Sequence, residues 1–511
     1  MVSLAMYKQV SLPDSEHRLT GHWGSRLLMT ALALACTSAL AQTAPGPDPQ
    51  APPSSTTAAQ QQATAGETAV TEVPEQAAEK YPVRDVPEVA DVVEEVESEG
   101  PSSQEQGSVS MNDSFGQLTR REKIIIQRKK AYEDTKADVQ IRSMLLDRDK
   151  FDDSEISAMA IGGYAGFKTG WFRDRFAFGA TLYTSQKLYG PEDKDGTSLL
   201  KAGQEGYTVI GEAYGQFRFT DTVFFDIGRK ALNTPYINKN DVRMTPNTFE
   251  TAMLQGVVGD AKEGNQWRFG AGYVNEIKLK NADEFISMSE AAGAPDGVIR
   301  GVAAGGANFQ RGDFSIGAVD YYSDDIINIF YTEAKYDVRI ADGYNLRFAA
   351  QYTSQESTGS DLLTGSDFST DQFGLKAELG VGKAWLFTTA WDTNGNGADL
   401  RAPWGGIPSY NSVQVQDFNR AGEDSFMLRA GYNFQAVQGL SMYGLWVNGS
   451  QPDNPDLSAQ DEYDFNIQWA AQEGSWKGFS ARLRYAVVTQ DFGGPDLQDF
   501  RIILNYDPPN L

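Results

Sequence analysis

Apolar and polar side chains alternate with a period of two residues along many short segments of the chain beyond residue 137. In segment 464–469 the apolar residues Phe465, Ile467 and Trp469 fall on one face of an extended strand, and the residues between them are Asp, Asn and Gln. This period is that of a β-strand, whose successive side chains point to opposite faces of a sheet. The chain beyond residue 137 is therefore predicted to be all-β and antiparallel, with one apolar and one polar face.

Two further features favour a transmembrane β-barrel over a soluble sheet. The polar face carries bulky charged groups in strand after strand, as in Arg482-Leu-Arg-Tyr-Ala-Val487. The connections also alternate in length, with short turns such as 220–222 and 341–343 on one rim and long loops such as 230–250 and 392–423 on the other. This arrangement is typical of barrels that span a membrane. A secreted β-sandwich or solenoid is the alternative, but it would have to explain why both faces of so many strands are occupied.

The segments with this alternation number eighteen, an even number within the range of known membrane barrels. The pattern is weakest in 251–258 and 301–309. The predicted fold is an 18-stranded antiparallel transmembrane β-barrel over residues 137–511, with constriction loops folded inward. The predicted strands are 137–146, 155–168, 176–187, 206–219, 223–229, 251–258, 265–275, 301–309, 312–322, 326–338, 343–353, 370–381, 383–391, 424–434, 438–449, 461–470, 477–489 and 498–507.

The chain before this region differs in composition. Residues 1–41 contain basic side chains, a short apolar stretch and a final Ala-Leu-Ala, which predict a secretory signal peptide; a lipoprotein modified at Cys36 is the alternative. Residues 42–117 are rich in Ala, Pro and Glu and carry fourteen acidic side chains against two basic ones. This composition predicts a disordered acidic extension in the periplasm of a Gram-negative envelope. Residues 118–136 are expected to form a short linker or helix.

Cysteine and histidine are nearly absent from the chain. Cys36, His17 and His22 are the single cysteine and the two histidines, and all three precede residue 42. Removal of a signal peptide would leave no thiol and no imidazole, which excludes Cys nucleophiles, Ser-His-Asp triads and His metal sites. We therefore expect no enzyme, no metal site and no cofactor. The formal net charge of −25 also argues against a nucleic-acid partner, because phosphate groups would be repelled.

The stretch 227–249 joins the end of an apolar strand to a long loop rich in Asn, Pro and Thr. Proline fixes φ and Asn bonds its own backbone, so this loop is expected to be structured. Its segments Gly228-Arg-Lys, Thr234-Pro-Tyr-Ile-Asn and Asp241-Val-Arg-Met-Thr-Pro-Asn-Thr-Phe249 resemble the OprD family of outer-membrane porins, in which such a loop folds into the pore. Segments 427–434, 479–485 and 496–503 are also similar to the family. The resemblance implies eighteen strands, a narrow constriction, substrate-selective uptake and a ladder of arginines.

Charged side chains of this loop and of the strand end before it become candidates for the pore constriction, because inward folding of the third long loop would narrow the lumen. These candidates are Arg229, Lys230, Lys239, Asp241 and Arg243. Strand alternation places further arginines on the inward face, and the resemblance implies that they form a basic ladder on the lumen wall: Arg268, Arg347, Arg429, Arg482, Arg484 and Arg501. Guanidinium groups at successive points can hold a carboxylate through paired hydrogen bonds. The alternative is that these arginines pair with lumen acids such as Glu212, Glu378 and Asp464.

Two segments qualify this interpretation. Residues 439–450 contain no basic side chain, although the family commonly carries ladder arginines on this strand, so part of the ladder is missing. The segment Asp392–Asp399 has the oxygen spacing of a calcium loop but lacks the acidic twelfth position, where Pro403 stands. We interpret it as the turn that opens loop 392–423, which is the second candidate for a pore-narrowing element.

The sequence predicts a passive outer-membrane porin for small organic solutes, and the ladder suggests that these solutes are anionic or bear carboxylates. The expected partners are outer-membrane lipid and the solutes, with the barrel acting as a monomer. Two other functions stay open. One is a surface barrel whose long loops act in adhesion or bind a partner. The other is a barrel enzyme, which the lack of histidine beyond residue 41 disfavours.

Overall fold

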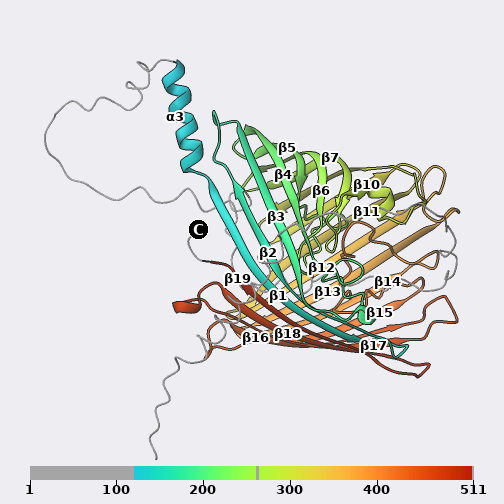
Figure 1. Ribbon diagram of the computed structural model, residues 1–511. Coiled ribbons are helices and arrows are strands. Elements are labelled where there is room, and N and C mark those ends of the chain that lie inside the picture. The colour runs from blue at the N-terminus through green and yellow to red at the C-terminus, as the bar shows by residue number, and fades with distance from the viewer. Residues whose placement is uncertain (1–119, 261–263, 509–511) are drawn as a thin grey trace, which may run out of the picture. The chain divides into compact units, whose positions relative to one another are not determined.

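The computed structural model describes residues 120–260 and 264–508, and the predicted signal peptide and acidic extension lie outside this part of the chain. Within it, eighteen long strands form one barrel, and a two-residue strand, β8 (Ile286–Ser287), lies in a loop (Figure 1). The barrel strands are β1 (Lys136–Asp149), β2 (Glu155–Lys168), β3 (Phe176–Tyr189), β4 (Tyr207–Thr220), β5 (Val223–Lys230), β6 (Thr248–Gly259), β7 (Gln266–Lys278), β9 (Val302–Arg311), β10 (Phe314–Ser323), β11 (Ile327–Ala341), β12 (Tyr344–Glu356), β13 (Ser369–Val381), β14 (Trp385–Asn394), β15 (Asp424–Asn433), β16 (Leu440–Ser450), β17 (Gln460–Ala470), β18 (Phe479–Gln490) and β19 (Leu497–Tyr506).

The barrel closes because its first strand pairs with its last. β1 is hydrogen-bonded to β2 on one side and to β19 on the other, in register from Ile141 opposite Tyr506 to Asp149 opposite Gln498. β9 pairs directly with β7, since β8 only adds to the end of β7. Closure removes the free strand edges that a bilayer could not satisfy. The predicted 18-stranded antiparallel barrel is confirmed, and it includes β6 and β9, which cover the two segments with the weakest pattern.

The burial pattern of the strands is the reverse of that of a soluble sheet. On β15, Phe426 and Leu428 are 39% and 49% exposed on the outer face, whereas Met427 and Arg429 are buried on the inner face. Exposed aromatic and aliphatic side chains occur on strands all around the barrel. Such an outer face suits the hydrocarbon of a bilayer, and the inner face can hold charge. No helix in residues 120–260 and 264–508 is long and apolar enough to cross a membrane.

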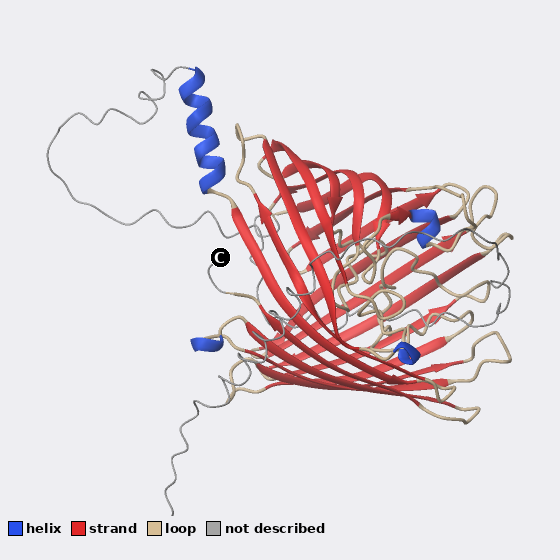
Figure 2. Ribbon diagram, viewed as in Figure 1, coloured by secondary structure: helices blue, strands red, loops and turns tan. Residues whose placement is uncertain are grey.

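The two rims of the barrel differ as the loop lengths predict. The short-turn rim includes the connections 221–222, 312–313, 342–343 and 382–384. The long-loop rim includes the connections 190–206, 231–247, 279–301, 357–368 and 395–423. Figure 2 shows loops in tan inside the ring of red strands, so long connections occupy the lumen as well as the rim.

Helix α3 (Arg120–Glu133) precedes β1 in the stretch where a linker or helix is expected. Its last turn packs on the turn between β2 and β3, where the Gly170 N–H donates to the Ala131 carbonyl oxygen at 2.9 Å. Position 170 has no room for a side chain, because a Cβ there would lie 2.6 Å from the Asp134 Cβ. This close approach fixes the end of the helix to the short-turn rim.

Candidate functional site

Loop 231–247 follows a strand end that contains a glycine with positive φ, and it is tied to a strand elsewhere on the wall. Gly228 has a φ of 114°, and a Cβ at this position would collide with the Ala213 carbonyl oxygen, so only glycine fits. On β1, Arg142 donates to the two carboxylate oxygens of Asp241 at 2.6 and 3.2 Å and to the Arg243 carbonyl oxygen at 2.6 Å. Since β1 and β5 are separated by three strands, this bidentate ion pair holds the loop away from the wall where it starts.

A second loop, 395–423, joins the first one inside the barrel. The Asn238 side chain donates to the Gly406 carbonyl oxygen and accepts from the Gly406 N–H, both at 3.1 Å. Ile237 forms a β-bridge with Trp404, whose indole N–H donates to the Met288 carbonyl oxygen in loop 279–301 at 2.8 Å. Hydrogen bonds thus connect three long loops within the lumen.

Apolar side chains fill the space between these loops and the wall formed by β9 to β12. Tyr236 and Trp404 are fully buried and belong to one cluster with Tyr321 and Tyr331. The Tyr236 hydroxyl donates to Thr353 Oγ1 at 3.1 Å, and the Tyr236 N–H donates to the Tyr321 hydroxyl at 3.3 Å. Close-packed aromatic rings with satisfied polar groups give the loops a defined position.

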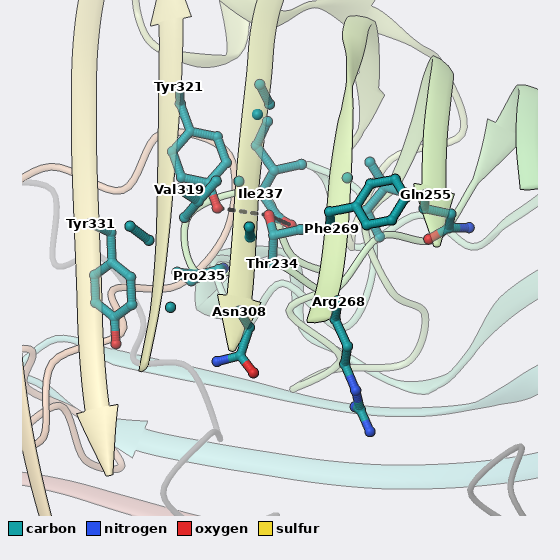
Figure 3. A pocket seen from close by; sticks show the side chains of 18 of the residues that line it. Thr234, Pro235, Ile237, Gln255, Arg268, Phe269, Asn308, Val319, Tyr321 and Tyr331 are labelled. Carbon is teal, nitrogen blue, oxygen red and sulfur yellow. Dashed lines mark hydrogen bonds between the residues drawn. The ribbon is translucent and has the colours of Figure 1, made fainter. Parts of the chain in front are cut away.

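A hollow of about 390 Å³ lies between loop 231–247 and the wall strands β6, β7, β9, β10 and β11. Tyr321 donates to Thr234 Oγ1 at 2.8 Å at the loop side of this hollow, close to Ile237 (Figure 3). Figure 3 also shows Arg268 and Asn308 extending from the wall away from these residues. The hollow therefore has an apolar end under the loop and a polar end near the short-turn rim.

The two constriction candidates at the end of β5 pair with neighbouring wall residues. Lys230 lies 2.6 Å from Asp226 Oδ2, on the inward face of the strand. Arg229 lies on the opposite face, 3.5 Å from Glu250 and 4.1 Å above the ring of Phe285. Both side chains therefore sit where the loop begins, with Lys230 on the lumen side.

The three candidates within loop 231–247 differ in exposure. Lys239 and Asp241 are partly exposed, and Asp241 is held by Arg142. Arg243 is 1% exposed, and its Nε donates to the Thr197 carbonyl oxygen at 3.0 Å. The guanidinium of Arg243 thus joins loop 231–247 to loop 190–206, which makes it a structural part of the constriction.

Four of the six ladder candidates lie on one side of the barrel. They are Arg429 on β15, Arg482 and Arg484 on β18, and Arg501 on β19, all on the inward face. Arg484 is directly opposite Arg501 in the strand register. Strand β16 has no basic residue, and its Tyr443 lies beside Arg429 on this part of the wall. The centroid of the Tyr443 ring is 3.8 Å from the guanidinium carbon of Arg429.

The other two ladder candidates lie elsewhere around the ring. Arg268 is on β7, at the polar end of the hollow. Arg347 is on β12 near the short-turn rim, where it makes a bidentate ion pair with Asp337 at 2.6 and 2.9 Å. Alternation gives the direction of an arginine side chain, but the position around the ring depends on which strand carries it.

Lys376, Tyr410 and Glu333 form a further group on the lumen wall; strand alternation places Lys376 on the inward face, but its partners were not expected from the sequence. The Lys376 ammonium lies 4.5 Å from the Tyr410 ring centroid, and the Tyr410 hydroxyl donates to Glu333 Oε1 at 3.0 Å. Burial raises the pKa of Tyr410, and the Glu333 carboxylate raises it further, so the hydroxyl stays protonated and donates. Only the path of loop 395–423 brings Tyr410 to this wall.

Carboxylate oxygens of segment 392–399 accept hydrogen bonds from later residues of loop 395–423. Asp392 Oδ2 accepts from Ser409 Oγ at 2.7 Å and from the Asn411 N–H at 2.8 Å. Asp399 Oδ1 accepts from the Ala421 N–H at 2.7 Å. These contacts support the interpretation of the segment as a turn. In the part of the chain that the structure describes, no group of three or more His, Cys, Asp or Glu side chains is placed to hold a metal ion.

A closed membrane barrel narrowed by loops folded into its lumen defines a porin, a channel for small solutes. A family model described as outer membrane porin, OprD family, matches residues 130–509. The chain therefore belongs to the OprD family and is an outer-membrane protein.

Individual members of the family are also similar to this chain. Porin D of Pseudomonas aeruginosa is 24% identical over 427 residues, which cover 73% of this chain and 90% of Porin D. The crystal structure of Pseudomonas aeruginosa OccK9 (OpdG) superposes with a TM-score of 0.66 at 19% identity, covering 74% of this chain and 100% of that one. A BenF-like porin from Pseudomonas fluorescens Pf-5 gives a TM-score of 0.64 at 17% identity, covering 74% and 99%. These relatives are porins, which are channels rather than enzymes.

Proposed function

We propose that this porin takes up small organic anions, in particular solutes that bear a carboxylate, and that it does so as a monomer. The observation that carries the proposal is the group of neighbouring arginines on β18 and β19. Arg484 and Arg501 are direct register partners, and Arg482 is two residues from Arg484 on the same inward face. Three guanidinium groups are thus adjacent on one patch of wall. Arg482 is partly exposed, whereas Arg484 and Arg501 are only 4% and 1% exposed.

The chemistry of this patch suits weak, successive binding of an anion. The Nε of Arg482 donates to the side-chain oxygen of Asn466 at 2.5 Å. Because Asn466 is neutral, this hydrogen bond orients the guanidinium without placing a negative charge beside its Nε. Planar guanidinium groups bind carboxylates through two parallel hydrogen bonds. Several such positions along a wet wall let a solute move from one to the next without being trapped.

One solved relative is consistent with this substrate class. Pseudomonas aeruginosa OpdK, with a TM-score of 0.63 at 18% identity and a coverage of 74% of this chain and 99% of OpdK, is known as a complex with vanillate, a carboxylate. At this level of identity the likeness concerns the fold, so the proposal for this chain depends on its own arginines.

Ion selectivity of single channels in planar bilayers tests the proposal. The wild-type protein should prefer anions in a salt gradient. The double variant Arg482→Ala and Arg484→Ala should lower the anion-to-cation permeability ratio about two- to fivefold for each charge removed. This size follows because one unit charge near a wet wall contributes about 1 kcal/mol. Arg311→Ala, at an exposed position beside a short turn, is the matched control and should have little effect. An unchanged ratio in the double variant would contradict the proposal.

A further inference from the structure

The middle of loop 395–423 contacts strands other than the two that carry the loop. The loop starts after β14 and returns to β15, but residues 414–416, here called the loop tip, contact β17 and β19. The N–H groups of Val415 and Gln416 donate to the two carboxylate oxygens of Glu462, each at 2.7 Å. Glu462 therefore receives two consecutive backbone donors of the tip.

Two other carboxylates accept hydrogen bonds from Gln414 of the loop tip. The Gln414 N–H donates to Asp464 Oδ2 at 3.2 Å, and the Gln414 side-chain amide donates to Asp499 Oδ1 at 2.7 Å. Glu462, Asp464 and Asp499, here called the carboxylate cluster, are at most 5% exposed. Burying three carboxylates is costly unless hydrogen bonds and counterions compensate, and the tip supplies the hydrogen bonds.

Arginines supply the counterions, and Arg484 is the one that attracts Asp464 most strongly. Arg501 Nε lies 2.6 Å from Asp499 Oδ1, and an Arg501 Nη2 donates to the Gln414 carbonyl oxygen at 2.9 Å. Arg148 Nε lies 2.8 Å from Asp499 Oδ2. Both arginines are almost fully buried, at 1% and 4% exposure. Their guanidinium groups are thus engaged with the loop tip and its carboxylates, in contrast to the partly exposed Arg482.

Apolar packing completes the contact between tip and wall. Val415 is fully buried in a cluster with Ala486, Val488 and Leu497 on β18 and β19. The tip is therefore held by hydrogen bonds at its backbone and by apolar contact at its central side chain. Such a contact has one geometry, because both kinds of interaction fall off steeply when the groups separate.

We infer that Glu462, Asp464 and Asp499 are positioning residues of the pore. They hold the loop tip against β17–β19 and thereby set the width of the passage and the accessibility of Arg482. In this arrangement Arg501 and Arg148 serve the loop tip, and the ladder that meets solute is shorter than the sequence suggests. The position of the loop follows from these contacts alone, whereas the role of Arg482 toward solute rests on the proposed function.

Neutralising the carboxylate cluster should change the ion preference of the pore in the direction opposite to that expected from simple electrostatics. Removing a negative charge from a lumen wall ordinarily raises anion preference, because the wall becomes more positive. If the carboxylate cluster holds the loop tip, its neutralisation releases the tip, and the wider lumen screens the arginines more effectively. Conductance should then rise while the preference for anions stays level or falls.

The first experiment compares carboxylate variants in planar bilayers. Glu462→Gln should raise single-channel conductance at least 1.5-fold, add rapid current fluctuations and leave the anion-to-cation ratio at or below that of the wild type. Glu378→Gln, which neutralises a partly buried lumen carboxylate on β13 outside the cluster, is the matched control and should raise the ratio without added fluctuations. If Glu462→Gln behaves like Glu378→Gln, the inference is wrong.

The second experiment reports loop position directly. Cys36 is the single cysteine of the sequence, so a Val415→Cys and Val488→Cys pair introduces the only thiols of the barrel. The pair should form a disulfide readily in the otherwise wild-type protein and at least tenfold more slowly when combined with Gln414→Ala, which loosens the tip without changing a strand. Equal rates would overturn the inference even if Glu462→Gln fails to fold. If instead Arg482→Ala and Arg484→Ala leave selectivity unchanged, the proposed function fails while the disulfide result still decides the loop contact.

Discussion

At the scale of single residues, the constriction depends on a few polar side chains that serve two loops at once. Asn238 is 1% exposed, and its side chain makes four hydrogen bonds: the amide donates to the Pro235 and Gly406 carbonyl oxygens, and the side-chain oxygen accepts from the Gly406 and Asn240 N–H groups. Gly405 is close by, and a Cβ there would lie 2.6 Å from the Asn238 amide. The joint between loops 231–247 and 395–423 therefore needs a small residue on one side and an amide on the other.

Asn238→Ala tests this joint. The substitution leaves the Gly406 N–H and carbonyl oxygen without their partner, and a buried polar group without a hydrogen bond costs about 1–3 kcal/mol. We expect the barrel to fold, because no strand pairing is touched, but the open channel should become noisier and conduct more. Asn345→Ala, at an exposed site near the short-turn rim, is the control. Single-channel records that match the wild type would show that the joint does not set the pore.

At the scale of elements, the strands and the loops have different structural roles. The strands provide an apolar outer face and a polar inner face, and the loops use the inner face as their support. Loop 231–247 is fixed by β1 through Arg142, and loop 395–423 by β17 and β19 through the carboxylate cluster. Each loop is thus held at both ends by its own strands and in the middle by strands several positions away.

Arg142→Ala should release the middle of loop 231–247. The change removes the bidentate ion pair with Asp241, in which each charge-assisted hydrogen bond contributes about 1.5–3 kcal/mol. We expect higher conductance and faster cleavage of loop 231–247 by an added protease in detergent. Arg142→Lys keeps the charge but cannot form two parallel bonds, so it should give an intermediate result. Arg175→Ala, on the short-turn rim, should change neither quantity; equal behaviour of all three variants would argue against the role of Arg142.

At the scale of the whole molecule, closure by β1 and β19 decides whether the barrel exists. Nine consecutive register pairs join the two strands, from Ile141 and Tyr506 to Asp149 and Gln498. The two strands are close to opposite ends of the described chain, so this is the strand pairing with the longest separation in sequence. Long-range pairing of this kind makes folding slow but leaves no open edge once it is complete.

Truncation after Asp496 removes β19 and should abolish the folded barrel. Two strands, β1 and β18, would then expose unpaired N–H and C=O groups to lipid, each at a cost of several kcal/mol. The measurement is the shift of the folded band in gel electrophoresis without heating, which should disappear. Truncation after Asp507 keeps all eighteen barrel strands and serves as the control. A truncated protein that still migrates as a folded band would show that β1 and β18 can close the barrel themselves.

Much of this architecture could be predicted from the sequence, because it depends on local patterns. The eighteen strands follow from an alternation that each segment displays independently, and the position of loop 231–247 follows from its prolines and asparagines. The inward direction of Arg429, Arg482, Arg484 and Arg501 follows from the same alternation. Family resemblance added the expectation that the loop enters the pore.

The candidate site was harder to predict, because its contacts join residues far apart in the sequence. Arg243 has the charge of a pore residue but is buried against loop 190–206. Arg501 has the alternation of a ladder residue but is engaged with Asp499 and Gln414. Arg268 and Arg347 face inward on strands far around the ring from β18. In each case the type and direction of the side chain were predictable, and its partner was not.

The sequence by itself determined that this chain forms a membrane barrel, since a period of two and the lengths of connections are properties of neighbouring residues. Only the tertiary structure decided which charges face solute. Closure of the barrel brings β1 beside β19, and the paths of loops 231–247 and 395–423 bring Asp241 to Arg142 and Gln414 to Asp499. The physical reason is that a charge acts through its nearest partners, and in a closed barrel those partners are set by strand order and loop path rather than by sequence distance.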